Sequence, residues 1–482
     1  MRESHEGSPT RECWTKAYEM RFCAPLPLLF RYTDSMHLKS SAARVATLIA
    51  ALLAILSTCM SATTGGSPVS TNTVVAAQIA CPQSNAALLL QPGFCVTIFA
   101  DSIGSARQLV VAPNGDVFVN LQATRRGPVA SIPAGLAALR DTNRDGRADI
   151  IERFGSGGNT GISLYNGFLY ADMGMSIVRY ALPAGRLRPA APPDTIVSGM
   201  PGQPGHLARN FAITADGTLY VNFGSPSNAC QLRDRAVGSP GKESCPELLT
   251  RAGIWKFDAN AKHQSPSIGS RHATGLRNSV SLTVDPSGRR LYAIPHGRDQ
   301  LGQSWPSLFT PEQNAELPAE MLVEVNAGDD FGWPYCYYDG IARGYRLAPE
   351  YGGDGKTVGR CEVLEPPLYA FPAHWAPNSI LFYTGSLFPA KYRNGIFVAF
   401  HGSWNRAPLP QAGFNVVFLS MHDQPDQTKF EVFADGFAAS NPPVSGAAHR
   451  PVGLAQGPDG ALYISDDVGG RIYRITWLAG TQ

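Results

Sequence analysis

The stretch that decides the fold lies near the end of the chain, where residues 452–475 read VGLAQGPDGALYISDDVGGRIYRI. Two runs of alternating apolar and small or polar residues flank Asp459-Gly460, and a third run follows Gly469-Gly470. Asp-Gly supplies the positive backbone φ of a tight hairpin, and the alternation is typical of half-buried antiparallel strands. The stretch therefore predicts three consecutive antiparallel strands joined by short turns.

Five weaker copies of this hairpin lie upstream. They cover residues 110–119, 162–170, 211–221, 282–292 and 394–400. The turn glycines are Gly115, Gly167, Gly217, Gly288, Gly395 and Gly460. Each interval between them is long enough for a four-stranded blade, which needs about 40–50 residues. We expect an all-β fold, a six-bladed β-propeller with insertions in the longer intervals. The alternative is an irregular β-sandwich whose turns match by chance.

The composition agrees with a turn-rich β-protein. Among 482 residues there are 49 Gly and 38 Pro, and only 16% of the residues are charged. The formal net charge is +2, and the sequence has no basic run or tail. Nucleic acids and acidic membrane surfaces are therefore not expected as partners.

The first part of the chain predicts export. Lys39 and Arg44 accompany an apolar run at residues 45–56, which is too short to span a bilayer and is typical of an export signal. We predict an extension upstream of the true start at 1–35, a signal at 36–62, a flexible lead-in at 63–80 and the propeller at 81–482. The expected location is periplasmic or secreted. A lipid anchor on Cys59 and an uncleaved membrane anchor are alternatives.

Six of the nine cysteines follow the predicted signal. They are Cys81, Cys95, Cys230, Cys245, Cys336 and Cys361. An even number in an exported chain predicts disulfides, and sequential pairing would close three local loops. Spacing alone does not fix the connectivity.

A calcium-loop motif stands at residues 141–152, which read DTNRDGRADIIE. The pattern matches the twelve-residue EF-hand loop, with oxygen ligands at regular positions and glycine at the sharp bend. The predicted metal residues are Asp141, Asn143, Asp145, Arg147 through its backbone carbonyl, Asp149 and Glu152. The flanks lack two amphipathic helices, so we expect an isolated loop inserted in a blade, with a structural role. A solvated turn is the alternative.

Polar residues recur where the predicted inner strands begin or their partners end. His206, Arg277 and Arg450 precede the third, fourth and sixth hairpins, and two further groups follow the fourth and fifth hairpins, at 296–299 and 401–406. In a propeller such residues converge at one end of the central channel. Their guanidinium groups would suit a planar, multiply anionic ligand, and a histidine could act as a general base.

The sequence resembles the soluble quinoprotein glucose/sorbosone dehydrogenases, and is most similar to the sorbosone-dehydrogenase-like branch. The resemblance rests on Gly-Leu-Arg-Asn at 275–278, Gly-Asp-Asp-Phe-Gly-Trp-Pro at 328–334, His-Gly-Ser-Trp-Asn-Arg at 401–406 and the stretch 457–474. It covers roughly residues 91–477. The resemblance implies a six-bladed propeller that binds pyrroloquinoline quinone and calcium.

The resemblance also implies residue roles. His206 would take the proton from the sugar hydroxyl, and Arg277 and Asn278 would contact the quinone oxygens. The backbone carbonyls of Gly297 and Arg298 would hold the calcium bound to the cofactor. The remaining implied contacts are Arg406 and Arg450 to cofactor carboxylates and Asn159 to substrate.

We therefore predict an exported oxidoreductase that oxidises a small-molecule sugar or aldehyde. The chain has no Cys-x-x-Cys-His motif for covalent haem, so a separate electron acceptor is expected. Gly205 stands where the glucose-oxidising members carry a carboxylate, and their lysine on the fifth blade is not evident, so glucose itself is not predicted. Two alternatives remain, a non-catalytic binding propeller and a calcium-dependent lactonase.

Overall fold

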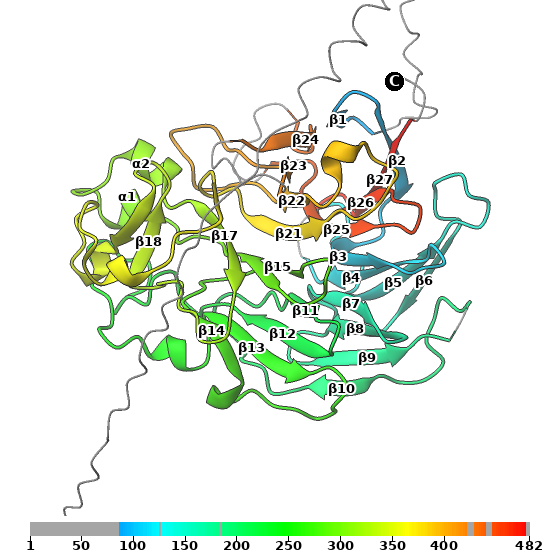
Figure 1. Cartoon of the computed structure of the whole chain (residues 1–482), viewed down its shortest axis with the longest axis horizontal. Helices are drawn as coiled ribbons and strands as arrows, with labels where there is room; N and C mark the ends of the chain where they lie inside the picture. The colour runs from blue at the N-terminus through cyan, green and yellow to red at the C-terminus, as the bar shows by residue number, and fades with distance from the viewer. Residues whose placement is uncertain (1–85, 125–126, 184, 422–428, 440–445, 479–482) are drawn as a thin grey trace, which may run out of the picture. The chain divides into compact units, whose positions relative to one another are not determined.

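The computed structural model describes residues 86–482, apart from 125–126, 184, 422–428, 440–445 and 479–482. Within these residues, six antiparallel sheets of four or five strands follow one another along the chain (Figure 1). The predicted segments 1–35, 36–62 and 63–80, with Cys59, and also Cys81, lie outside the described residues.

The first three sheets each use four consecutive strands. The first contains β3 (Ser105–Val111), β4 (Val117–Gln122), β5 (Gly135–Arg140) and β6 (Ile150–Phe154). The second contains β7 (Ile162–Tyr165), β8 (Phe168–Asp172), β9 (Ile177–Ala181) and β10 (Asp194–Val197). The third contains β11 (Phe211–Ile213), β12 (Thr218–Phe223), β13 (Gly253–Asp258) and β14 (Arg271–Thr274).

The last three sheets include strands from elsewhere in the chain. The fourth contains β15 (Ser281–Val284), β16 (Leu291–Ile294), β17 (Glu320–Val325) and β20 (Tyr369–Phe371). The fifth contains β21 (Pro377–Phe382), β22 (Ile396–Phe400), β23 (Asn415–Leu419), β24 (Glu431–Asp435) and, at its edge, β1 (Leu89–Leu90). The sixth contains β25 (Pro451–Gln456), β26 (Leu462–Asp466), β27 (Arg471–Trp477) and β2 (Phe94–Ala100).

The first strands of neighbouring sheets contact one another in a closed ring. Each of β3, β7, β11, β15 and β21 contacts the next, β21 contacts β25, and β25 returns to β3. The sheets are therefore the six blades of a β-propeller, and the fold predicted from the sequence is confirmed. All six predicted hairpins lie where the first two strands of a blade meet, although the fifth has a longer connection between β21 and β22.

The core lies between blades rather than in one central mass. Six clusters of buried residues each draw on two neighbouring blades, for instance Tyr170 with Trp255, and Leu322 with Ile396. Successive side chains along a strand point to opposite faces of the sheet, and each face packs against a neighbouring blade. Both faces of a blade must therefore be apolar.

The sixth blade closes the ring with a strand from the other end of the described chain. Strand β2 pairs with β27 in antiparallel register, so Phe94 lies opposite Trp477. Phe94 packs edge-on against Phe388 and Phe433, with ring centroids 4.8 Å apart in each pair. Such aromatic contacts contribute stabilisation beyond the area they bury, and here they attach the closing strand β2 to the fifth blade.

The fourth blade carries the long insertion that the interval from Gly288 to Gly395 predicted. Helices α1 (Leu301–Ser304) and α2 (Pro311–Glu316) precede β17, and the hairpin β18 (Cys336–Asp339) and β19 (Gly344–Leu347) follows it. Figure 1 shows α1, α2 and β18 together at one side of the blades. Short 3₁₀ turns cover Pro246–Leu249, Ile268–Ser270, Pro349–Tyr351, Gly359–Val363 and Ala390–Tyr392.

Disulfides fasten the loops around this insertion. Cys230 is bonded to Cys245 in the third blade, and Cys336 to Cys361 in the fourth, as sequential pairing predicted. The hydroxyl of Tyr335, next to Cys336, accepts a hydrogen bond from the backbone N–H of Cys245 at 3.0 Å. The two disulfide-bonded loops therefore contact each other.

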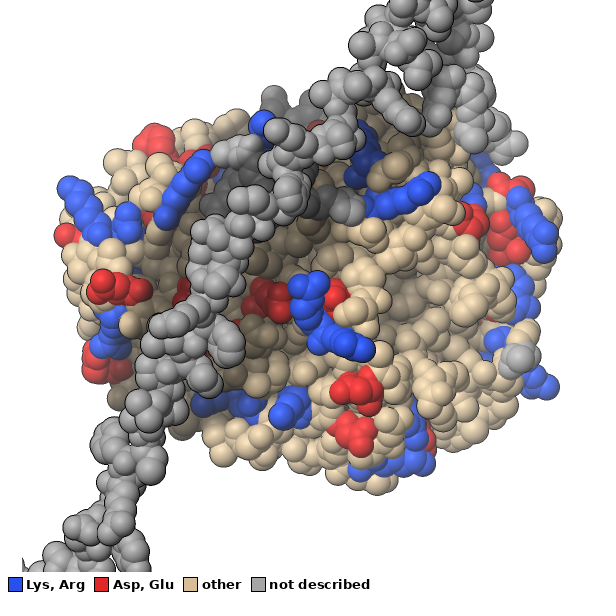
Figure 2. All heavy atoms as spheres, in the orientation of Figure 1, with Lys and Arg blue, Asp and Glu red and all other residues tan. Residues whose placement is uncertain are grey.

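Charges on the surface are mixed. Figure 2 shows lysine and arginine side chains interspersed with aspartate and glutamate over the visible face. None of the described helices is both long and apolar enough to cross a membrane.

Candidate functional site

A cavity of about 260 Å³ opens between the third, fourth and fifth blades. It lies at the end of the channel where the first strand of each blade begins and the second strand ends. Its volume is near the lower limit of ligand pockets in proteins, which suits a compact ligand. The residues that line it are His206, Arg235, Arg277, His296, Gly297, Asp299, Glu320, His374, Ala376, Trp404 and Asn405.

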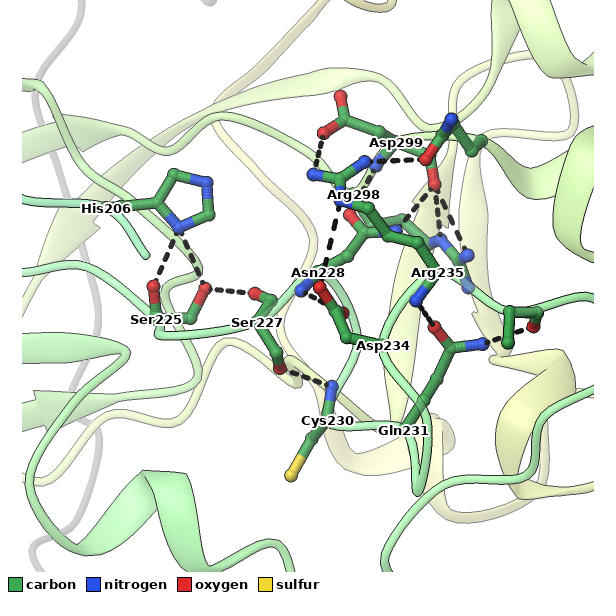
Figure 3. A network of polar contacts seen from close by, with 12 residues as sticks. His206, Ser225, Ser227, Asn228, Cys230, Gln231, Asp234, Arg235, Arg298 and Asp299 are labelled. Atoms are coloured by element: carbon green, nitrogen blue, oxygen red, sulfur yellow. Dashed lines mark hydrogen bonds and ion pairs between the residues drawn. The ribbon is translucent and has the colours of Figure 1, made fainter. Parts of the chain in front are cut away.

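His206 lies in the segment that connects β10 to β11. Its Nδ1 is 2.8 Å from the Ser225 carbonyl oxygen and 3.2 Å from the Ser225 hydroxyl oxygen. The hydroxyl itself donates to the Ser227 carbonyl at 2.6 Å, so both Ser225 oxygens accept and Nδ1 carries the proton. Figure 3 shows the second ring nitrogen pointing away from Ser225.

This tautomer leaves Nε2 of His206 as a bare acceptor. No hydrogen-bond partner of Nε2 is found among the residues that the structure describes. Burial, and then the positive charge of Arg277, lower the pKa of His206 to about 3. The imidazole is therefore neutral at neutral pH, with a lone pair available to accept a proton in the cavity.

Asp299 connects the three blades around the cavity. Its Oδ2 accepts from Arg277 at 2.8 Å and from Arg235 at 2.9 Å, and its Oδ1 accepts from the Asn405 amide at 3.0 Å. Burial acts to raise the pKa of Asp299, but Arg277 and Arg235 outweigh it and hold that pKa well below the usual range. Asp299 is thus ionised, and Figure 3 shows it at the centre of its contacts.

Arg277 is held firmly from every side. Besides Asp299, its guanidinium donates to the Gly297 carbonyl at 2.8 Å and to the backbone and side-chain oxygens of Asn228 at 3.2 and 3.1 Å. Its exposed fraction is only 4%. A guanidinium fixed in this way presents its charge to the cavity without needing to reorganise when a ligand binds.

Glu320 is a second carboxyl in the cavity, and it has no charged partner within hydrogen-bonding distance among the described residues. It begins β17 and accepts only from the backbone N–H groups of Gly297 at 2.9 Å and Ala376 at 3.4 Å. Burial raises the pKa of Glu320 to about 8, and those two hydrogen bonds only partly oppose the rise. Glu320 is therefore mostly protonated at neutral pH.

Two further histidines face the cavity as neutral groups. Nε2 of His296 is 2.9 Å from the Pro377 carbonyl, and Nε2 of His374 is 2.9 Å from the Asn314 carbonyl. Burial lowers the pKa of both, to about 4 for His296. At neutral pH the lining therefore holds two guanidinium cations and one ionised carboxylate, which leaves one excess positive charge in the lining, although Asp234 outside it lies 3.8 Å from Arg235.

Asn405 adds an acceptor that is not satisfied. Its amide nitrogen contacts Asp299 and lies 3.4 Å from Nδ1 of His374, while its Oδ1 is buried without a hydrogen-bond partner in the described part of the chain. A buried polar atom without a partner is unfavourable unless a ligand or water satisfies it. The guanidinium groups fit carboxylate or keto oxygens of an anionic cofactor, whereas the bare Nε2 and this amide oxygen are acceptors that fit hydroxyl or N–H groups of a ligand.

The structure brings only some of the sequence-predicted residues into this cavity. His206, Arg277 and Gly297 line it. Asn278 instead uses its Oδ1 to accept from the Asn222 amide at 3.1 Å, between the third and fourth blades. Arg298 turns away from the cavity and pairs with the buried Glu350 at 2.5 Å.

Three other predicted residues bridge neighbouring segments outside the cavity lining. Arg406 donates to the carbonyls of Ala315 and Ala373 at 2.6 and 3.0 Å and pairs with Glu316. Arg450 donates to the carbonyls of His401 and Gly402 and stacks on Phe414. Asn159 donates to Asp172 at 2.7 Å and to the Leu207 carbonyl at 2.8 Å.

Several cavity residues were missed by sequence reasoning. Asn405 stands beside Arg406 in the polar group at 401–406, and Asp299 ends the polar group at 296–299, but the sequence assigned neither of them a role. Arg235, Glu320 and His374 carry no motif that would identify them.

The calcium-loop motif connects β5 and β6 of the first blade, away from the cavity. Both Asp141 oxygens accept backbone hydrogen bonds, from Arg144 at 2.6 Å and from Gly146 at 2.8 Å. Asp145 accepts from the Arg147 N–H at 2.9 Å, and Asp149 accepts from the Thr142 N–H at 2.7 Å. Gly146 has a φ of 86°, which lets the chain turn sharply at that point. Asn143 accepts from the Asp145 N–H, and Glu152 lies on β6 opposite Ala138.

Comparison with protein families and curated proteins found relatives. A family model described as TrAA12-like matches residues 88–478. An uncharacterized protein of Borreliella burgdorferi is 31% identical over 204 residues, which are 42% of this chain and 48% of that protein. A pyrroloquinoline quinone-dependent pyranose dehydrogenase of Coprinopsis cinerea is 26% identical over 294 residues, which are 51% of this chain and 37% of that enzyme. The chain thus spans about half or less of the length of these curated relatives.

Solved structures share the fold. The holo form of the pyranose dehydrogenase PQQ domain from Coprinopsis cinerea superposes with a TM-score of 0.64 at 20% identity, covering 83% of this chain and 99% of that one. A calcium structure of the Trichoderma reesei AA12 enzyme gives a TM-score of 0.65 at 18% identity, covering 81% and 97%. At these identities the likeness establishes a common propeller architecture.

Proposed function

We propose that this chain, which belongs to the TrAA12-like family, is a quinoprotein that oxidises a sugar with pyrroloquinoline quinone and calcium. The resemblance predicted from the sequence is confirmed by that family membership and by the relatives named for pyrroloquinoline quinone-dependent sugar oxidation. The observation that carries the proposal is the meeting of a bare His206 Nε2 with two guanidinium groups in one cavity.

Arg277 and Arg235 would hold the anionic cofactor in this cavity. Their charges are only partly balanced by Asp299, so they would attract carboxylates and polarise keto oxygens. Arg406 and Arg450, and Asn278, remain proposed contacts from the sequence, but their present partners favour a role in joining neighbouring segments. The quinone, when bound, would be the two-electron oxidant of the reaction.

His206 would accept the hydroxyl proton of the substrate at Nε2. A pKa of about 3 makes a weak base, but it belongs to a cavity with an excess positive charge. An anionic ligand on Arg277 would oppose the electrostatic part of that depression and bring the pKa nearer to neutrality, where a general base works best. Ser225 meanwhile keeps the proton on Nδ1, so that Nε2 stays the accepting atom.

Reconstitution with pyrroloquinoline quinone and calcium tests the proposal. We expect the loaded protein to bleach the quinone with one or more of a panel of aldopyranoses, sorbosone and simple aldehydes. His206→Asn should retain the quinone and lose the bleaching. His263→Asn is the matched control, because His263 is exposed on the same blade and its φ of 57° is one that asparagine tolerates.

Failure to bind the quinone would overturn the proposal and favour the non-catalytic binding propeller. Among the described residues His206 has no carboxylate hydrogen-bond partner, which supports that second function. Lactone hydrolysis in calcium without quinone would instead favour the lactonase. The sorbosone-like preference and the separate electron acceptor stay proposals that the same panel, with different acceptors, can test.

Calcium is proposed at two places. Near the cavity, the carbonyls of Gly297 and Arg298 would hold it, although the Gly297 carbonyl already accepts from Arg277. In the first blade, the loop at 141–152 would hold a structural ion. At 100 times its Kd, calcium should add about 2.7 kcal/mol to the free energy of unfolding.

Asp145→Asn should abolish this stabilisation, measured as the calcium-dependent shift in Tm. Asp354→Asn is the control, since Asp354 also accepts backbone hydrogen bonds in an exposed loop. An unchanged calcium response in the Asp145 variant would contradict the loop proposal.

We also propose that the protein is exported, to the periplasm or beyond, with Cys59 as an alternative lipid anchor. Its two disulfides between described cysteines support an oxidising compartment. Fractionation of cells that express the full chain, followed by detection of the mature protein and of any attached lipid, tests this proposal.

A further inference from the structure

Two buried arginines hold the segment that carries His206. This segment covers residues 201–206, and neither arginine belongs to it. Arg251 precedes β13 and has an exposed fraction of 4%, while Arg209 precedes β11 and is fully buried. Neither contributes to the lining of the cavity.

Arg251 contacts the histidine segment and also the residue that follows β12. Its Nη1 donates to the Gly202 carbonyl at 2.9 Å, and its Nη2 donates to the carbonyls of Pro204 at 3.3 Å and His206 at 3.1 Å. Its Nε donates to the Gly224 carbonyl, one residue before the Ser225 that binds His206. One planar guanidinium therefore connects the histidine segment to the end of β12.

Arg209 supports the same segment from within the third blade. Its guanidinium donates to the His206 carbonyl at 3.1 Å and to the Pro201 carbonyl. The His206 carbonyl thus accepts from both arginines. The rigid fork of a guanidinium fixes several acceptors in one plane, which a lysine ammonium does not do.

The two guanidinium groups are unusual because they are buried without a carboxylate. No carboxylate lies within ion-pair distance of either among the described residues. Burial lowers the pKa of both, to about 10 for Arg209. Elsewhere the chain supplies a partner to a buried arginine, as Glu350 does for Arg298. Burial of an unpaired cation is unfavourable, so the contacts to the segment must compensate for it.

We infer that Arg251 is a positioning residue that fixes the His206 ring against Ser225 and so keeps Nε2 directed into the cavity. The inference rests on the proposed function for its effect on turnover, but the orientation of the ring is a property of the protein alone. Without the guanidinium, four backbone carbonyls lose a donor. The histidine segment then loses this link to the end of β12 and keeps the weaker hold of the His206 N–H, which donates to the Ser225 carbonyl at 3.0 Å, and of Arg209.

The test uses Arg251→Gln and Arg251→Lys, with Arg271→Gln as the matched control. Arg271 lies on β14 of the same blade and donates to the Leu248 carbonyl at 2.8 Å, outside the histidine segment. The first readout is the ¹⁵N spectrum of the histidine rings, with His206 assigned by its loss in His206→Asn. The second is kcat and KM of the quinone-loaded protein.

In the wild type and in Arg271→Gln, His206 should show a single tautomer with the proton on Nδ1. Arg251→Gln should show mixed tautomers and a kcat lowered about 10- to 100-fold, because misplacement of a catalytic group by about 1 Å has that effect. Its KM should change little. Arg251→Lys should be intermediate, since it keeps the charge and can reach only part of the carbonyl set.

A folded Arg251→Gln or Arg251→Lys variant with one tautomer and wild-type kcat would overturn the inference. So would a fall in kcat that merely equals the fall in folded fraction. If the wild type shows no quinone-dependent turnover, the proposed function fails, and the ring spectrum alone still decides whether Arg251 positions His206.

Discussion

Two histidines at the same end of the channel have opposite surroundings. His206 in the third blade contacts only neutral oxygens of Ser225. His401 follows β22 in the fifth blade, and its Nε2 is 2.9 Å from the Asp467 carboxylate. Asp467 also accepts from Arg107 at 2.7 Å, so this second group joins the fifth, sixth and first blades through one ionised carboxylate.

The difference separates groups that can react from groups that hold the blades together. Burial acts to raise the pKa of Asp467, but His401 and Arg107 outweigh it and hold that pKa well below its usual range. Among the described residues His206 and Glu320 have no charged hydrogen-bond partner. Burial therefore lowers the pKa of His206 and raises the pKa of Glu320, so that the neutral form of each is favoured. Neutral partners thus leave a titratable group able to exchange a proton, whereas ionic partners fix its charge.

Replacement of each of these two histidines by asparagine is the strongest test of the proposed difference between them. His206→Asn should lower kcat about 10²- to 10⁴-fold, the usual range for loss of a general base. His401→Asn should leave kcat within a small factor and lower the free energy of unfolding by about 1–3 kcal/mol, because Asp467 loses a buried partner. Steady-state kinetics and urea denaturation measure the two effects, and a reversed pattern would refute the assignment.

Asp299→Asn tests the role of an ion-paired carboxylate within the cavity. It leaves Arg277 and Arg235 without their shared carboxylate, so the free energy of unfolding at pH 7 should fall by about 3–5 kcal/mol. The folded pKa of Asp299 is depressed, so its contribution is present above the unfolded pKa of about 3.9 and is lost as pH falls through the folded value.

Urea denaturation from pH 2 to 7 should therefore show a weaker loss of stability in acid for the variant than for the wild type. Parallel curves would mean that Asp299 is not paired as described.

Glu320→Gln tests the carboxyl group whose described hydrogen-bond partners are all neutral. The folded pKa of about 8 lies above the unfolded value, so the folded state holds the proton longer. Stability is then greatest below the unfolded pKa and falls as pH rises toward 8, by on the order of a few kcal/mol. The glutamine variant should lack this alkaline loss, and an identical slope in both proteins would show that Glu320 is already ionised.

An anionic ligand should sharpen the contrast at His206. Bound to Arg277, it would oppose that residue's charge and raise the His206 pKa by about one unit or more, which corresponds to about 1.4 kcal/mol. Titration of the His206 ring ¹⁵N signals with and without the quinone measures this change, and an unchanged pKa would show that the ligand does not act through Arg277.

The ring of blades could be predicted from the sequence because its signals are local. Each Asx-Gly or Gly turn lies between two alternating runs, and the stretch at 452–475 contains three strands of one blade. Prediction of the site residues required knowing toward which side of the chain each side chain points, and the sequence indicates this less clearly. In extended segments, neighbouring side chains point to opposite sides.

Two adjacent pairs illustrate that limit. Arg277 faces the cavity while Asn278 faces the third blade, and Asn405 faces the cavity while Arg406 faces the α2 loop. The sequence predicts both Arg277 and Asn278 as cofactor contacts, and Arg406 rather than Asn405, because the motif alone does not indicate which side chain faces the cavity. Glu320 begins the third strand of its blade, a strand that usually lies away from the channel, so only the folded chain reveals it.

A single-turnover experiment tests the central claim most directly. Protein loaded with one equivalent of pyrroloquinoline quinone in calcium is mixed with excess pyranose, and the quinone absorbance is followed in the wild type and in His206→Asn. We predict complete bleaching in the wild type and bleaching at least 100-fold slower in the variant, with equal quinone retained. Equal rates in the two proteins, or a wild type that never retains the quinone, would contradict the claim that this cavity is a quinone-dependent dehydrogenase site.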